Sequence, residues 1–377
     1  MQFFQPTRGI FLAVLFTALS APSFLQAQTS DELKELTKIP LWFKTFNLRA
    51  GFGYKDNVLL SQSGEKQSAF WTTGLDLLLW RLPTHGWQFN FLLSGDDFRY
   101  VRAVGVENEQ LLIAQAQLTK SFEPDLKLTI PVQYIYLNQV FDVSATERVK
   151  SIGKVLGHSI ALRPTLRKEL GRYWVEGEGS VLRQYFVRPL DDYWQIGPKL
   201  SVGRQLDDKS SLVLDHEIHW LLYDHRRQTD LRGTDLAGTS LQLQTQVIEL
   251  VYNRRWDKAD QLSSATKLAF ELSDDQGPGF YDYQLYRLSQ QVGYRAKTWQ
   301  ITAQFKVGHY EYAHQRVSSI DPALRYKTGL TYDFRVEKNV TKSFKIFASF
   351  VHDRSISNLG FDRYGVSTTA TGIDWQF

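Results

Sequence analysis

The stretch TWQITAQFKVGHY, residues 298–310, divides into two faces when its residues are taken alternately. The apolar face consists of Trp299, Ile301, Ala303, Phe305 and Val307, and the polar face of Gln300, Thr302, Gln304, Lys306 and Gly308. A helix would distribute these apolar side chains around its circumference, whereas a strand separates them because successive side chains point to opposite faces. The stretch is therefore predicted to be a β-strand with one oily and one hydrophilic side.

The same alternation recurs along the chain and is separated by two kinds of connection. It is clear in 43–54, 67–80, 126–136, 192–204, 210–223 and 324–336, and less regular in 155–168 and 240–256. Short polar turns are expected within 81–87, 121–127, 168–174, 205–211, 255–261, 294–300 and 337–343, and longer loops at 55–66, 98–108, 141–154, 187–191, 225–239, 273–280, 312–323 and 354–362. Seven turns and eight loops join sixteen strands, and the less regular segments leave fourteen or eighteen open. The pattern predicts an all-β fold, a single closed antiparallel transmembrane β-barrel with short periplasmic turns and longer extracellular loops.

Composition agrees with a barrel that crosses a membrane by its strands. The 377 residues are 14% aromatic, contain no Cys and have a mean hydropathy of −0.32. Beyond the N-terminus no run approaches the ~20 apolar residues of a spanning helix, but a barrel strand needs only ~9–11 residues. The net charge is +4, and the Lys and Arg residues are scattered along the sequence, so no basic stripe favours nucleic acid as a partner. A water-soluble sandwich with an aromatic core is the alternative.

The N-terminus has the layout of a secretory signal. One charged residue, Arg8, precedes an apolar run at 10–19, and small residues with Pro22 follow up to a cleavage position after Ala27. A retained membrane-anchoring segment is the alternative interpretation. The expected organisation is a signal peptide at 1–27, a short periplasmic segment at 28–42 and the barrel at 43–377. The expected location is the bacterial outer membrane, in contact with its lipid.

The last seven residues, TGIDWQF, again place apolar side chains at every second position. This ending resembles the carboxy-terminal signature of bacterial outer-membrane β-barrels, which finishes in Phe with alternating hydrophobic residues before it. The resemblance implies that Ile373, Trp375 and Phe377 form the segment read by the barrel assembly machinery.

The stretch GFGYKDNVLLS, residues 51–61, resembles the GYxDNV-type first strand of uncharacterised and export-associated porin-like barrels. The resemblance implies that Tyr54, Asp56 and Asn57 mark the first outer loop. Asp and Asn also favour turns by bonding nearby backbone, so a purely structural role is the alternative. Tyrosines at the loop ends of the strands are expected to form an interfacial belt, namely Tyr54, Tyr100, Tyr223, Tyr281, Tyr283, Tyr310 and Tyr364.

Residues able to carry chemistry form no recognisable signature. The His216–His219 spacing suits a metal on a helix, but on a strand these side chains point to opposite faces. Hydrolytic candidates are His309, His352 with Asp353, and His158 with Ser159, and Ca²⁺ candidates are Asp96, Asp97, Asp274 and Asp275. Neither catalysis nor a cofactor or metal is expected.

The hydrophilic face carries the functional prediction. The lumen and selectivity residues are expected to be Arg49, Lys127, Arg163, Arg167, Glu176, Glu178, Asp215, Glu217, Arg295, Lys306, Arg325, Lys327 and Arg335. Basic residues outnumber acidic ones on this face along 295–345, which predicts a moderate anion preference. Alternatively, the charges pair across strands and stabilise the wall. The leading hypothesis is a porin-like channel for passive diffusion of small hydrophilic solutes, as a homotrimer or a monomer. Alternatives are a barrel for polysaccharide or surface-lipoprotein export, a lipid hydrolase, and a structural barrel with a closed lumen.

Overall fold

The computed structural model describes residues 40–62, 66–103, 105–142, 152–187, 190–257, 259–318 and 320–377. The predicted signal peptide and most of the predicted periplasmic segment lie outside these residues. The strands are β1 (Trp42–Lys55), β2 (Ser68–Thr84), β3 (Trp87–Tyr100), β4 (Asn108–Glu123), β5 (Leu126–Asp142), β6 (Ile152–Leu162), β7 (Thr165–Leu170), β8 (Tyr173–Val187), β9 (Tyr193–Asp207), β10 (Ser210–Tyr223), β11 (Gln242–Arg255), β12 (Leu262–Asp274), β13 (Tyr283–Arg295), β14 (Trp299–Arg316), β15 (Leu324–Asn339), β16 (Phe344–Ser357) and β17 (Tyr364–Gln376). A short 3₁₀ turn, η1 (Gly360–Asp362), precedes β17.

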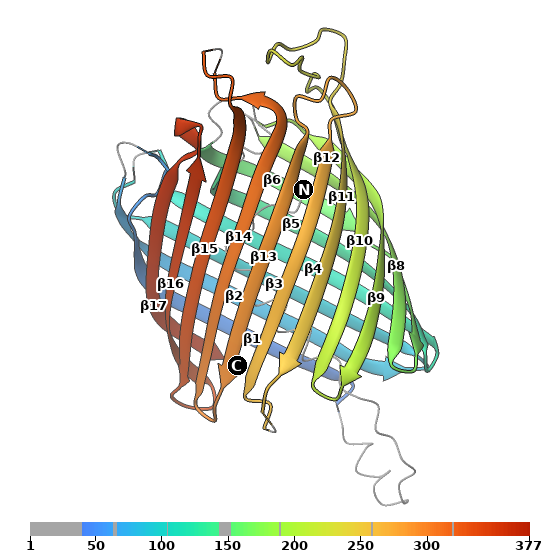
Figure 1. Cartoon of the computed structure of the whole chain (residues 1–377). Helices are drawn as coiled ribbons and strands as arrows, with labels where there is room; N and C mark the ends of the chain where they lie inside the picture. The colour runs from blue at the N-terminus through green and yellow to red at the C-terminus, as the bar shows by residue number, and fades with distance from the viewer. Residues whose placement is uncertain are drawn as a thin grey trace, which may run out of the picture.

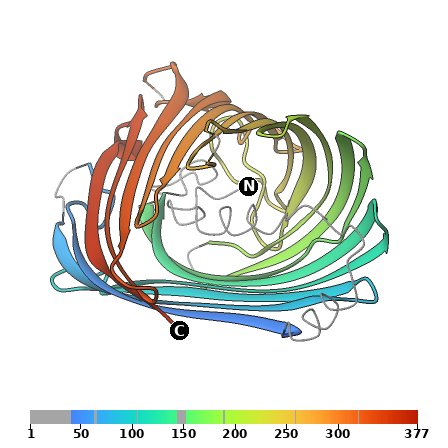
Figure 2. The same cartoon turned by 90° about the horizontal axis from the view of Figure 1, so that it is seen from below.

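All these strands form one antiparallel sheet that closes on itself. β1 pairs with β2 on one side and with β17 on the other, so the first and last strands share a seam. Along this seam Arg49 lies opposite Asp374 and Asn47 opposite Gln376. Figures 1 and 2 show the resulting hollow barrel from the side and from below.

β6 and β7 are two parts of one barrel strand. Both pair with β5 and with β8, in a register that continues across the gap between them. Arg163 N donates to Pro131 O (3.3 Å) and Gly179 N to Pro164 O (3.0 Å), but neither proline has an N–H to return the bond. The ladder is therefore interrupted at these two prolines, and the barrel has sixteen strands, as the sequence predicted.

The connections alternate as predicted. Tight turns join β2 to β3, β4 to β5, β7 to β8, β9 to β10, β11 to β12, β13 to β14 and β15 to β16. The longer connections lie at the other end, where the 224–241 segment rises highest, and the C-terminus lies at the tight-turn end (Figure 1). None of the helices in the described part of the chain is long and apolar enough to span a membrane.

The outer face of the barrel is apolar along its strands. Phe52, Trp71, Leu200 and Leu268 are at least half exposed, and Phe350 is 41% exposed. A soluble protein rarely exposes such a continuous apolar surface. Side chains of this kind around a closed sheet fit contact with hydrocarbon.

The inner face is not uniformly hydrophilic. On β2 and β3, Leu78 and Leu92 have the same parity as Asp76 and Ser94, and Ile113 of β4 pairs opposite Ser94. These strands are therefore apolar on both faces over part of their length, which the two-sided prediction missed. In Figure 2 the wall made by β1–β5, in blue to teal, is the flattest side of the barrel.

The predicted tyrosine belt is wrong for six of its seven members, because Tyr100 and Tyr364 line a cavity inside the barrel and four others are buried. Tyr223, Tyr281, Tyr283 and Tyr310 are each less than 9% exposed, whereas Tyr54 is 42% exposed. Tyr283 and Tyr310 pack with Leu285 and Tyr312, and the other two pack with loop residues. These rings have inward parity or lie in loops that fold over the strand ends, so they stabilise the lumen wall from inside.

Candidate channel lumen

Most inward cations lie beside carboxylates. Arg49 contacts Asp76 at 2.9 Å, and Lys199 contacts Asp215 at 2.9 Å, in each case on the neighbouring strand. Arg167–Glu176 (3.9 Å) and Arg287–Glu271 (2.9 Å) are further pairs between neighbouring strands. The pairs Arg167–Glu169 (2.8 Å), Arg335–Glu337 (2.7 Å) and His219–Glu217 (3.5 Å) instead join residues two positions apart on one strand. Cross-strand pairing, the alternative interpretation of the inward charges, therefore accounts for part of them.

Several inward cations reach elements that are not their strand neighbours, among them Arg49 on β1 with Asp96 on β3 (3.2 Å) and Lys55 on β1 with Glu109 on β4 (3.1 Å). The side chains of Lys327 on β15 and Asp142 at the end of β5 form a buried ion pair between strands far apart in the sheet. Arg325 donates through Nε (2.9 Å) and Nη2 (2.6 Å) to Asp362 of η1 and packs over the ring of Tyr312. The Lys327–Asp142 contact joins the outer ends of β15 and β5, and the Arg325–Asp362 contact joins β15 to the loop that contains η1.

A smaller group of predicted lumen residues has no ion pair with any described residue. It comprises Lys127, Arg163, Glu178, Arg295 and Lys306. Lys127 and Arg295 are exposed near the tight turns, whereas Arg163, Glu178 and Lys306 are half-buried.

A cavity of about 360 Å³ lies in the corner where the β1–β5 wall meets β14–β17. Phe98 and Phe141 line it from the first wall, and Phe347 and Val351 line it from β16. Its charged lining includes the predicted residues Arg49, Lys306, Lys327 and Arg335, together with Lys55, Glu109, Asp142, Asp333 and Asp353. Lys55 and Asp142 were expected in loops, because the sequence pattern ended β1 and β5 too early.

The first outer loop folds into this corner through the DNV motif. Asn57 is fully buried and donates from Nδ2 to Ser61 O (2.8 Å) and Gly365 O (2.9 Å), while its Oδ1 accepts from Ser61 N (2.9 Å). Asp56 accepts from the backbone N–H of Ser367 on β17 at 2.7 Å. These bonds fix the loop to β17, and Val58 then packs against a cluster that includes Ala103, Val106, Val140 and Val366.

A second set of loops covers the opposite part of the outer end. Leu241 and Phe280 from the loops pack with Tyr193 of β9 and with Leu221 and Tyr223 of β10. The outer loops therefore pack on the strand ends at two places.

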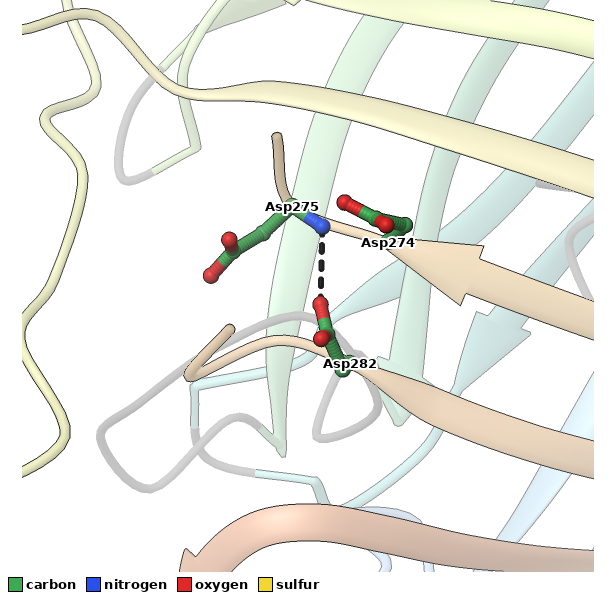
Figure 3. A group of neighbouring side chains, drawn as sticks. All are labelled: Asp274, Asp275 and Asp282. Atoms are coloured by element: carbon green, nitrogen blue, oxygen red, sulfur yellow. Dashed lines mark hydrogen bonds between the residues drawn. The ribbon is translucent and has the colours of Figure 1, made fainter. Parts of the chain in front are cut away.

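The predicted acidic cation sites are engaged within the protein. Asp275 is fully buried, and its carboxylate accepts from the backbone N–H groups of Gly277 (2.9 Å), Gly279 (2.8 Å) and Tyr281 (3.1 Å). The Asp282 carboxylate points at the Asp275 amide and accepts from it at 2.8 Å (Figure 3). Burial raises the pKa of Asp282, and the nearby Asp275 carboxylate adds to the rise. Although Asp274, Asp275 and Asp282 lie within 4.8 Å of one another, they organise a loop.

Asp96 and Asp97 do not form a joint cation site, because neighbouring strand residues point to opposite faces. Asp96 contacts Arg49 in the lumen, whereas Asp97 contacts Arg99 (2.6 Å) and Gln110 (2.8 Å). His216 and His219 are likewise separated, since His219 is buried and His216 is exposed.

The hydrolytic candidates are not brought together in the pairs that the sequence offered. His352 and Asp353 are adjacent on one strand, as are His158 and Ser159, so the side chains of each pair point to opposite faces of the sheet. His309 has Thr328 Oγ1 at 2.8 Å from Nδ1 and Glu311 Oε1 at 3.4 Å from Nε2. However, these residues lie in the paired ladder of β14 and β15, where backbone N–H groups bond across the strands and are not free to hold an oxyanion.

The C-terminal aromatic residues lie on the outer face at the seam. Ile373, Trp375 and Phe377 are 42%, 50% and 58% exposed, and Phe377 N donates to Phe46 O at 2.8 Å. The terminal residue is thus held against β1. Its part in assembly stays a prediction.

Solved structures share this architecture. No protein-family model and no curated protein matches the sequence. Acinetobacter baumannii OccAB3 matches with a TM-score of 0.50 and 10% identity over 89% of this chain and 98% of that one. An anion-selective porin from Comamonas acidovorans matches with a TM-score of 0.48 and 10% identity (89% and 99% covered). The trimer form of OmpT, an outer membrane protein of Vibrio cholerae, matches with a TM-score of 0.47 and 9% identity (90% and 100% covered). With its closed sixteen-stranded sheet and apolar outer face, the chain has the fold of the bacterial outer-membrane porin-like β-barrels.

Proposed function

We propose that the protein is a porin-like channel of a bacterial outer membrane through which small hydrophilic solutes diffuse passively. The observation that carries this proposal is the charged cavity inside a sixteen-stranded wall, because side chains alone do not fill a barrel of that size. The signal peptide at 1–27, the periplasmic segment at 28–42 and the barrel from residue 43 complete the proposed organisation. No catalytic group or cofactor takes part in this function.

The predicted lumen residues tune which solutes pass. Cationic and anionic side chains on facing strands create a transverse field that orients dipolar solutes. Because the inward cations Arg49, Lys199 and Arg335 lie beside carboxylates, we expect a smaller anion preference than the sequence suggested. The preference itself stays a prediction.

Planar-bilayer recording of the refolded mature barrel tests the proposal. Stable ohmic openings in KCl are expected, and the shift of the reversal potential in a KCl gradient measures the anion preference. Correctly inserted protein that never conducts would contradict the channel and favour the export or closed-lumen alternatives. Crosslinking of the refolded protein in detergent distinguishes a homotrimer, the form of the Vibrio cholerae OmpT structure, from a monomer.

The export alternative rested on the DNV motif, and that motif has a structural explanation here. Asp56 and Asn57 bond to the backbone of β17 and of their own loop. Their side chains therefore close the outer corner without any partner protein.

A further inference from the structure

Two charged residues in the corner cavity, a lysine and an aspartate, form no ion pair with the described residues of the barrel wall. The cavity residues Arg49, Lys55 and Arg335 contact Asp76, Glu109 and Glu337, respectively. Lys306 and Asp333 line the same cavity, yet neither forms a hydrogen bond or ion pair with any residue in the described part of the chain. Both side chains are half-buried, so each loses part of its water without gaining a fixed partner.

The two residues occupy diagonal positions on neighbouring strands. Lys306 pairs opposite Thr331, and Asp333 is the next inward residue of β15. Such diagonal positions place Cβ atoms roughly 7–8 Å apart. A solute with an ammonium and a carboxylate on neighbouring carbons fits between them, its carboxylate toward Lys306 and its ammonium toward Asp333.

A second carboxylate reinforces the cationic half of such a solute. Asp353 on β16 lies opposite Thr331 and accepts from its hydroxyl at 2.6 Å. Lys306 interacts electrostatically with Asp333 and Asp353, but forms a contact with neither. The charges therefore form a row of cation, carboxylate and carboxylate over three neighbouring strands.

Part of the cavity lining is apolar, and the cavity has the volume of a small-ligand pocket. Its 360 Å³ falls within the usual range of about 300–1,000 Å³. Phe98 and Phe141 face it from the β1–β5 wall, and Phe347 and Val351 from β16. An apolar side chain on the solute would leave water by contacting these rings.

We infer that this cavity recognises α-amino acids with an apolar side chain, as a binding site on the diffusion path. The inference rests on the proposed channel function and names a solute class for it. Three features of the solute are recognised together, namely its carboxylate by Lys306, its ammonium by Asp333 and Asp353, and its side chain by the aromatic lining.

Single-channel block by matched probes tests the inference. L-Phenylalanine is expected to reduce the current through the wild-type barrel in a saturable way. N-Acetyl-L-phenylalanine lacks the ammonium, L-phenylalaninamide lacks the carboxylate, and L-serine lacks the apolar side chain. Each is expected to need a concentration about tenfold higher for the same block, because one charged contact or the apolar contact is missing.

Substitutions then assign the contacts. Lys306→Met and Asp333→Asn are each expected to weaken block by L-phenylalanine about tenfold. Lys338→Met is the matched control, since Lys338 is an exposed lysine over the Trp299 ring, outside the cavity. The probes require no substitution, so the inference is testable even where a variant does not refold.

The outcomes separate the two proposals. A barrel that never conducts overturns the channel itself. Ohmic conductance with equal block by all four probes, or unchanged block in both lumen variants, overturns the amino-acid site and leaves the channel intact.

Discussion

Asn57 shows how one side chain closes the outer corner of the barrel. It is buried completely and satisfies backbone groups of its own loop and of Gly365. The sequence predicted a turn at this position but not its partner, because Gly365 lies 308 residues away. Local turn chemistry is readable from neighbouring residues, whereas a bond to the far end of the chain depends on closure of the sheet.

Replacing this side chain tests its role. Asn57→Ala leaves Ser61 N and two carbonyls without their partner, and each buried unsatisfied group costs about 1–3 kcal/mol. We expect the 56–62 loop to be cleaved faster by limited proteolysis while the barrel stays folded on unheated gels. Gln62→Ala removes an exposed amide from the same loop and is the control. Equal cleavage of both variants would contradict this assignment.

The stability of the loop after β12 is expected to depend on pH because of Asp282. Burial raises its pKa above the unfolded value of about 3.9. The loop is therefore most stable below that value and loses stability as pH rises through the folded pKa. Hydrogen-exchange protection factors within 275–282 are expected to fall over that range in the wild type. In Asp282→Asn they should be flat, and a slope that persists there would rule out this carboxyl as the cause.

At the scale of elements, the strands and turns were predictable and their inner surface was not. The alternation of apolar and polar residues in 298–310 or 324–336 directly predicts a β-strand, because the face that contacts lipid must be apolar. Leu78 and Leu92 broke the pattern, since the lumen tolerates apolar residues where solute or loops can cover them. Tyr283 and Tyr310 were misplaced for a similar reason: a tyrosine suits both a membrane interface and a covered lumen wall.

The interrupted strand β6–β7 supports a prediction about its ladder. Arg163 O receives no N–H from Pro131, and Thr165 Oγ1 donates to it instead at 3.1 Å. Thr165→Val removes this donor and is expected to destabilise the barrel by about 1 kcal/mol. Pro164→Val supplies an N–H for Gly179 O and is expected to stabilise it by about 0.5–1.5 kcal/mol.

Urea unfolding in lipid vesicles, compared at constant m-value, measures both changes. A Pro164→Val barrel with a lower unfolding midpoint would show that the gap relieves strain. In that case Pro164 would be a favourable feature of the wall.

For the whole molecule, the sheet order explains why the lumen site was only partly predicted. The sequence pattern assigns residues to the inner face but does not say which strands face each other across the lumen. Lys327 was expected inside, yet its partner Asp142 was assigned to a loop. The closed sheet of β1–β17 brings the two together, and the corner cavity is formed by the same approach.

The buried pair of Lys327 and Asp142 is therefore expected to stabilise the barrel as a whole. Both side chains are less than 10% exposed, so removal of one partner takes the ion-pair partner away from a buried charge. Lys327→Met and Asp142→Asn should each lower the free energy of unfolding by about 3–5 kcal/mol. The double variant should lose less than the sum of the two, because neither charge then remains alone.

An exposed pair provides the comparison for this cycle. Arg99 and Asp97 are in contact at 2.6 Å, but Arg99 is 59% exposed, so their coupling is expected to be below about 1 kcal/mol. Urea titrations of both cycles in the same vesicles measure the two couplings directly. If the Lys327–Asp142 coupling were no larger than that of the exposed pair, the contact across the corner would not hold the two walls together. The 56–62 loop, the seam between β1 and β17, and the packing of Val140 with Val366 would then have to maintain the corner, because they also connect these walls.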